Sequence, residues 1–113
     1  MAVPPDDVDD GGIDVAVEHE PGDERARVRV EGEVDTASVG ELTAALERLV
    51  ANGATDLRLD LADVAFMDST GLTALITAKT LLEGRGSITV ESASSAVRRT
   101  FEVAGLDVVF GTA

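Results

Sequence analysis

The spacing of the apolar residues switches repeatedly between a two-residue and a three-to-four-residue period, and the order of these periods limits the folds open to the chain. Residues 13–17 and 26–30 alternate between apolar and polar or small side chains, on either side of a Pro21-Gly22 turn. A two-residue period is typical of strands, so this segment predicts an antiparallel hairpin. The arginines of the second strand share one face, where we expect them to stay hydrated or to pair with acidic residues of the first strand.

A helix is predicted next, because Ser38 and Glu41 have the spacing of a capping box. In that motif the serine hydroxyl accepts a hydrogen bond from the third helical amide, and the glutamate carboxylate accepts one from the amide of the serine. Apolar residues continue at helical spacing, and Asn52-Gly53 suits the left-handed turn that ends a helix. We therefore expect a helix over residues 39–51 whose start is held by these two side chains.

Strands and helices continue to alternate after this helix. Residues 57–61 alternate as a strand does, and their apolar pattern continues irregularly to Met67. The apolar stripe of the helix that follows is expected to consist of Leu72, Leu75, Ile76 and Leu82, with Lys79 at its edge. Residues 88–90 predict a short strand, and Ser94 is expected to cap a last helix that stops at Gly105. The apolar side of that last helix carries Val97, Phe101 and Ala104.

This order of elements predicts an α/β fold. An N-terminal antiparallel hairpin is expected to join strands that run parallel wherever a helix intervenes, in one mixed sheet packed against amphipathic helices. The length of 113 residues leaves room for one domain, since single domains most often have roughly 100 to 150 residues. Residues 1–12 contain four aspartates and little to bury, so we expect an acidic, disordered tail followed by a single domain over 13–113.

Composition excludes several classes of partner and site. Nine Lys and Arg residues against 22 Asp and Glu residues leave a net charge of −13, which repels phosphate backbones, and the chain has no Trp or Tyr on which bases could stack. We therefore expect no nucleic acid partner and favour proteins with basic surfaces. The absence of Cys excludes disulfides and thiolate metal sites. No apolar run approaches the ~20 residues that span a bilayer and no secretory signal is present, so we expect a cytoplasmic protein without membrane insertion.

Ser69 stands at the joint between the irregular third strand and the helix after it. Its hydroxyl should be exposed beside unpaired backbone donors, but the one histidine, His19, lies far away in sequence, and no base is evident that would make Ser69 a nucleophile. We therefore expect Ser69 to be acted upon by a kinase. An alternative stays open, because Asp68, Ser69 and Thr70 are all ordinary N-cap residues and one of them would cap this helix in any protein.

Gly71 favours an interaction surface at this joint. Glycine in the first helical turn costs up to roughly 1 kcal/mol against alanine, so a surface that another backbone approaches closely explains it better than a cap alone. Phe66 is expected chiefly to fill the core and secondarily to extend that surface. The chain has no phosphate-loop motif, and Asp60, Asp63 and Asp68 should point apart along a strand and a bend. We therefore expect neither a metal nor a cofactor.

Three segments, in this order, resemble the STAS domain family in its single-domain form as a bacterial anti-sigma factor antagonist. They are the strand end 30–35 with the helix after it, the segment 57–75 with its Asp-Ser-Thr-Gly-Leu run, and the last helix and its exit over 94–107. The middle segment is the most specific of the three. The resemblance covers residues 13–110 and implies a STAS-like mixed sheet.

In that family an anti-sigma factor, which is a GHKL-type serine kinase, binds either a sigma factor or the antagonist. The resemblance implies that the unphosphorylated chain captures the kinase and frees the sigma factor, that phosphorylation of Ser69 ends the capture, and that a phosphatase restores it. It also implies that the chain is not itself an enzyme. The implied partner-binding residues are Asp35, Thr36, Asp68, Ser69, Thr70, Gly71 and Leu72.

Two other functions compete with this one. A STAS module that binds no such kinase, for example the partner subunit of a lipid transporter or a scaffold in a stress-signalling complex, would have the same fold. The Ser-Thr pair after Asp68 favours the antagonist. A nucleotide-binding or hydrolytic protein with Ser69 as its nucleophile is disfavoured, because the sequence offers no base, phosphate loop or metal ligands for it.

Overall fold

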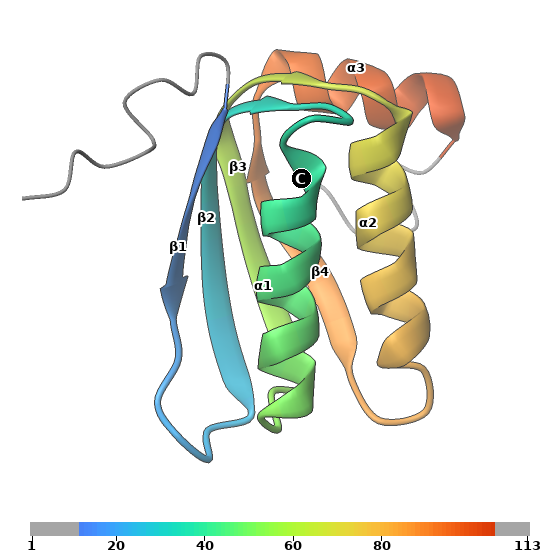
Figure 1. Ribbon diagram of the computed structural model, residues 1–113. Coiled ribbons are helices and arrows are strands. Elements are labelled where there is room, and N and C mark those ends of the chain that lie inside the picture. The colour runs from blue at the N-terminus through green and yellow to red at the C-terminus, as the bar shows by residue number, and fades with distance from the viewer. Residues whose placement is uncertain (1–11, 106–113) are drawn as a thin grey trace, which may run out of the picture.

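The strands of the described chain form one mixed sheet, with helices on both of its sides (Figure 1). The computed structural model describes residues 12–105. Its elements are β1 (Ile13–Glu18), β2 (Arg25–Val34), α1 (Val39–Ala51), β3 (Asp56–Met67), α2 (Ser69–Leu81), β4 (Ser87–Ala93) and α3 (Ser95–Ala104). The expected tail, apart from Gly12, and the expected end of the domain beyond Gly105 lie outside the described residues.

The sheet has the strand order β1-β2-β3-β4. β1 pairs antiparallel with β2, whereas β2 with β3 and β3 with β4 are parallel, because α1 and α2 carry the chain back between those strands. The mixed α/β sheet predicted from the sequence is confirmed. Parallel strands end at the same edge, so the segments after β2, β3 and β4 meet at one end of the molecule (Figure 1).

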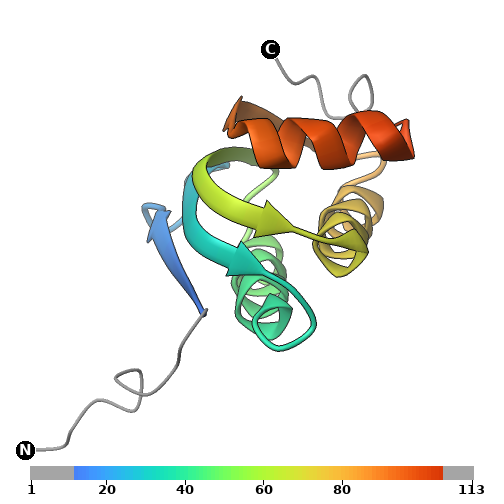
Figure 2. The same ribbon diagram turned by 90° about the horizontal axis from the view of Figure 1, so that it is seen from above.

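The helices divide between the two sides of the sheet. α1 and α2 cover one face, and Figure 2 shows α3 on the opposite side of the strands, at the end where β2 and β3 finish. The central strands bury apolar side chains between these layers: Val28, Val30, Leu57, Leu59 and Leu61 are fully buried. α3 contributes Val97 and Phe101 to the same core, while Ala104, expected on its apolar side, is exposed.

β3 departs from a regular two-residue period in its second half. Its pairing with β2 shifts between Arg29 and Glu31 and again between Gly32 and Glu33, and at each shift β3 contains one residue more than β2. Buried positions in β3 are therefore two apart up to Leu61 and then three apart, at Val64 and Met67. Such bulges redirect side chains, and here they place Phe66 outside the core.

Arg27 and Arg29 of β2 form ion pairs with the parallel strands of the sheet and not with the neighbouring β1. Arg27 contacts Glu91 of β4 at 3.2 Å, and Arg29 contacts Asp63 of β3 at 2.7 Å. Arg58 of β3 shares Glu91 with Arg27 at 3.4 Å. Of the two sequence expectations, pairing with acidic residues of the first strand is not found for Arg27 and Arg29, although Glu18 of β1 is in register with Arg27. The other expectation agrees with the structure, because the arginines of β2 are exposed.

In α2, the position of Ile76 differs from the sequence expectation and that of Lys79 agrees with it. Ile76, expected in the apolar stripe, is 40% exposed, because the buried stripe runs through the small residues Ala74 and Ala78 beside Leu75. Lys79 is half-buried, consistent with a place at the edge of that stripe.

None of the helices described over residues 12–105 is long and apolar enough to cross a membrane.

Candidate functional site

The turn before α1 and the start of α2 lie next to each other because β2 and β3 end together. Val34 and Met67, the last residues of these strands, are paired in register, and the Asp68 amide donates to the Val34 carbonyl at 3.2 Å. Asp35 directly follows β2, and Asp68 directly follows β3. The sheet topology thus brings together two segments that stand more than thirty residues apart in the sequence.

Asp68 is the N-cap of α2. Its Oδ1 accepts a hydrogen bond from the Thr70 amide at 2.9 Å and a second one from the Thr70 hydroxyl. The hydroxyl bond is the main reason why the pKa of Asp68 lies below its ordinary value, and the backbone bonds act in the same direction. The carboxylate therefore stays charged at neutral pH beside the positive end of the helix.

Ser69 is the first residue of α2, and its side chain is exposed. Its hydroxyl makes no hydrogen bond with any residue of the described chain, whereas its carbonyl accepts one from the Thr73 hydroxyl at 3.0 Å. The sequence left open which of the three polar residues caps the helix, and the structure assigns that role to Asp68. The Ser69 hydroxyl is consequently free to react without loss of the cap.

The next three residues are much less accessible. Thr70 is half-buried and its hydroxyl is engaged by Asp68, while Gly71 and Leu72 are buried. A Cβ on Gly71 would lie 2.6 Å from Met67 Cγ and 3.0 Å from Val34 Cγ1. The close approach that explains this glycine is therefore made by the chain's own strand ends, which corrects the expectation that a partner requires it.

The turn between β2 and α1 is held by Asp35 and Ser38 and not by a capping box. The buried Ser38 hydroxyl donates to the Glu33 carbonyl at 2.7 Å and accepts from the Asp35 amide at 3.1 Å. Asp35 Oδ1 in turn accepts from the amides of Ala37 and Ser38. The expected capping box is wrong, because the Ser38 side chain points back to the strand.

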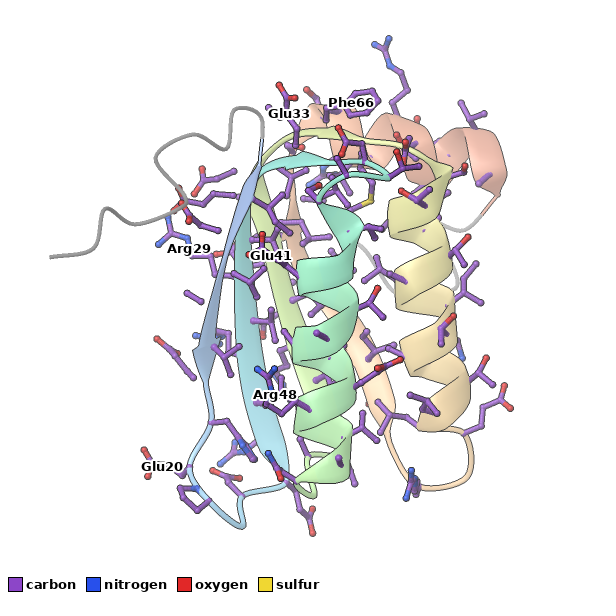
Figure 3. The ribbon with its side chains drawn as sticks, in the orientation of Figure 1. Glu20, Arg29, Glu33, Glu41, Arg48 and Phe66 are labelled. Carbon is purple, nitrogen blue, oxygen red and sulfur yellow. The ribbon has the colours of Figure 1, made fainter. Side chains whose placement is uncertain are left out.

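Glu41 takes no part in that turn. It is exposed and borders the groove between β1 and α1, away from the amide that it was expected to reach (Figure 3).

Thr36, at the tip of the turn, is exposed, and Asp35 is half-buried. Of the residues expected to bind a partner, Thr36 and Ser69 are thus exposed. Asp35, Asp68 and Thr70 form the hydrogen bonds that shape their surroundings.

Phe66 is a surface residue that the sequence placed in the core. Its side chain is 48% exposed, and Figure 3 shows it beside Glu33, with which it is paired in register, at the same end of the sheet as the turn. The two extra residues in β3 cause this orientation. A strand period read from sequence cannot locate such insertions, although the irregular spacing after Leu61 is their visible trace.

α3 is fastened to the end of β3 by two hydroxyl groups. Ser94 Oγ donates to the Val64 carbonyl at 2.6 Å and also accepts from the Val97 amide at 3.2 Å, which confirms Ser94 as the cap. Thr100 Oγ1 donates to the Met67 carbonyl at 2.9 Å. These bonds fix the first turns of α3 beside the residue that precedes Asp68.

The site presents an exposed hydroxyl with no catalytic partner of its own. The ring of His19 lies in the β1–β2 turn, at the opposite end of β2, with Nε2 2.8 Å from the Asp23 carbonyl oxygen, so no imidazole is near Ser69. No group of three or more His, Cys, Asp or Glu residues within 12–105 is arranged to hold a metal ion. Ser69 offers a hydroxyl to an external catalyst, with helix amides nearby to accommodate an added anion.

Comparisons with known proteins agree with this geometry. Residues 18–111 match the family model described as "Mlab, STAS domain". The anti-sigma-B factor antagonist of Bacillus subtilis is 40% identical over 81 residues, which cover 71% of this chain and 73% of that protein. The corresponding protein of Staphylococcus epidermidis is 34% identical over 85 residues, covering 74% and 79%.

Solved structures show the same fold. An anti-sigma factor antagonist from Mycobacterium paratuberculosis superposes with a TM-score of 0.79 at 31% identity, over 88% of this chain and 84% of that one. Unphosphorylated SpoIIAA, also an anti-sigma factor antagonist, has a TM-score of 0.75 at 24% identity over 88% of each chain, and at this identity the likeness concerns the fold. On the sequence matches together with the sheet topology, the chain belongs to the STAS-domain family of anti-sigma factor antagonists.

Proposed function

We propose that this chain is a cytoplasmic anti-sigma factor antagonist that binds a GHKL-type anti-sigma kinase in its unphosphorylated form, frees a sigma factor, and is switched off by phosphorylation of Ser69. The observation that carries the proposal is that Asp68 and Ser69 have separate roles at the start of α2. Asp68 caps α2, and the exposed Ser69 hydroxyl next to it is left without a hydrogen bond among the described residues. Its relatives, named anti-sigma-B factor antagonists, support the proposal.

The local contacts favour Ser69 over Thr70 as the acceptor. A kinase must reach the hydroxyl and align it with the γ-phosphate, and the Thr70 hydroxyl is half-buried and bonded to Asp68. Ser69 meets neither obstacle. A phosphatase that removes the phosphate completes the cycle, and the antagonist itself contributes no catalytic group.

Phosphorylation acts by charge at a surface that otherwise stays intact. A phosphoserine adds roughly −1.5 to −2 charge, here beside the Asp68 carboxylate, whose lowered pKa keeps it ionised. The positive end of α2 accommodates this charge within the protein, but a partner packed against Ser69 would have to bury it. The modified chain therefore keeps its fold and loses its partner.

The test uses each purified GHKL-type anti-sigma kinase of the organism that encodes this chain. Wild type should bind one of them and, with Mg-ATP, gain one phosphate at Ser69 and dissociate. Ser69→Ala should fold normally and bind constitutively, and Ser69→Asp should bind at least about tenfold more weakly. Thr36→Ala should bind more weakly too, if the exposed turn belongs to the docking surface.

Two control variants test whether the effects depend on position 69 or follow from the substitution itself. Ser87→Ala removes another exposed serine, at the start of β4, and it should leave phosphorylation unchanged. Ser87→Asp adds the same charge at the exposed start of β4, at the opposite end of the sheet, and should leave binding unchanged. Phosphate on Thr70, or an unphosphorylated wild type that copurifies with a transporter subunit, would contradict the proposal and favour a STAS module of a lipid transporter or signalling scaffold.

A further inference from the structure

A second exposed surface lies beside Ser69, between the end of β3 and the first turns of α3. A hollow of about 380 Å³ is lined there by Phe66, Met67, Ser95, Ala96, Arg99 and Thr100. Phe66 and Arg99 are exposed at its rim, and the buried Met67 and half-buried Thr100 form its floor. We refer to this surface as the Phe66–Arg99 patch.

The charged residue that lines this patch is the cation Arg99, while Glu33 lies beside Phe66 at its edge. Arg98 and Arg99 adjoin each other in a chain whose net charge is −13. Arg98 Nε donates to the Ala93 carbonyl at 3.1 Å, which holds its guanidinium at the positive end of α3. Arg99 makes neither an ion pair nor a hydrogen bond with any residue that the structure describes, in contrast to the paired arginines of β2 and β3.

We infer that the Phe66–Arg99 patch is a second part of the surface that docks the anti-sigma kinase, where it receives an apolar side chain flanked by a carboxylate. This inference rests on the proposed function and adds to it the chemistry of the partner's contact. An exposed ring beside a hollow fits an apolar group, and an unpaired guanidinium fits a carboxylate. Aromatic and arginine side chains of this kind commonly supply most of the binding energy of an interface.

The area that a stable complex needs supports the same extension. A standard interface buries about 800 Å² on each partner, which the exposed Thr36 and Ser69 cannot supply alone. The bond from Thr100 to the Met67 carbonyl ties the patch rigidly to the start of α2. A partner that covers Ser69 therefore finds Phe66 and Arg99 held at a fixed position beside it.

Four variants test this inference by titration against the kinase that binds wild type. Phe66→Ala and Arg99→Glu should each raise Kd at least about tenfold. Leu81→Ala removes an apolar side chain at the far end of α2 that is 40% exposed, against 48% for Phe66. Arg85→Glu reverses the charge of an exposed arginine in the turn after α2. Both controls should change Kd less than about twofold. At saturating kinase, Phe66→Ala and Arg99→Glu should still be phosphorylated at Ser69.

The outcomes separate this inference from the proposed function. Unchanged affinity of Phe66→Ala and Arg99→Glu, with Ser69 phosphorylated in wild type, would overturn the docking role of the patch and leave the proposed function standing. Absence of binding by wild type would overturn both. If Phe66→Ala and removal of residues 106–113 lowered the melting temperature equally, the chain's own end would cover the ring, and the docking role would again be overturned. If removal of residues 1–11 raised the affinity for the kinase, and Arg99→Glu abolished that increase, the patch would instead bind the chain's own acidic start.

Discussion

The Ser38 hydroxyl joins two backbone groups of the turn before α1. It bridges the Glu33 carbonyl and the Asp35 amide, and its own amide donates to Asp35 Oδ1. Because Ser38 is buried and these hydrogen bonds are partly buried, removal of the hydroxyl leaves the Glu33 carbonyl and the Asp35 amide with restricted access to water. The geometry of the turn that presents Thr36 thus depends on a side chain that does not touch solvent.

We predict that Ser38→Ala lowers the free energy of unfolding by about 1–3 kcal/mol, because it deprives a partly buried donor and a partly buried acceptor of this partner. Glu41→Ala is the matched variant. A capping box would make both substitutions costly, whereas the observed contacts predict no measurable loss for Glu41→Ala. Urea denaturation of the three proteins distinguishes these expectations, and equal losses would restore the capping box.

Gly71 gives a second prediction at the scale of single residues. Gly71→Ala should destabilise the protein by about 1–3 kcal/mol, since the new methyl group would overlap Met67 and Val34, and this exceeds the gain of roughly 1 kcal/mol in helix propensity. Gly40→Ala, in the first turn of α1, meets no atom within 4 Å and should stabilise by about 0.4–1 kcal/mol. Thermal denaturation measures both variants. Shifts in melting temperature of the same sign would contradict this interpretation.

At the scale of elements, the start of α2 is set by the pair Asp68 and Thr70. The Thr70 hydroxyl is the largest cause of the lowered pKa of Asp68. A group whose pKa is depressed in the folded state contributes stability above its unfolded pKa and loses that contribution as the pH falls through its folded pKa. The contribution of this cap is therefore complete at neutral pH and is lost in acid, below the ordinary value of 3.8.

We predict that Thr70→Val raises the pKa of Asp68 toward 3.8, because it removes the hydroxyl donor and keeps the backbone donor. Titration of the Asp68 carboxyl carbon by NMR measures this directly. The stability difference between wild type and Thr70→Val should be constant near neutral pH and shrink as the pH falls below 3.8. An unshifted pKa in Thr70→Val would refute the leading role of the hydroxyl.

The order and type of the elements could be predicted from the sequence, but their irregular ends could not. The apolar period was sufficient for the bounds of α1 and for the parallel pairing, and the terminal residue was sufficient for the Ser94 cap. The capping box expected at the start of α1 was wrong, because the Ser38 side chain bonds to the end of β2. Phe66 and Ile76 were misplaced, since their orientation depends on two extra residues in β3 and on tertiary packing of small residues along α2. The position of Ser69 was predicted, whereas the identity of its cap required the geometry of Asp68.

At the scale of the whole molecule, the net charge of −13 opposes compact folding. The open face of the sheet offsets part of it with ion pairs that involve Arg27, Arg29 and Arg58, but these side chains are about half exposed and such pairs contribute roughly 0–1 kcal/mol each. Repulsion among the unpaired acids should outweigh them at low ionic strength.

We predict that the melting temperature rises as NaCl increases from about 20 mM to about 0.5 M, because the Debye length falls from roughly 20 Å to roughly 4 Å and screens this repulsion. A variant without residues 1–11 loses four aspartates and should show a smaller rise, with little change in stability at high salt. A fall in melting temperature with salt would mean that the ion pairs of the open face dominate instead.

The separate roles of Asp68 and Ser69 give the two chemical forms of this protein, under the proposed function, the same durability. Since the phosphate is added to a hydroxyl that supports nothing in the fold, the silent form should survive in the cell as long as the active one. A cell can then hold a reserve of antagonist and recruit it by hydrolysis of one ester, without new synthesis. The ratio of the two forms then follows the balance between kinase and phosphatase activity and does not depend on how fast the chain is made or degraded.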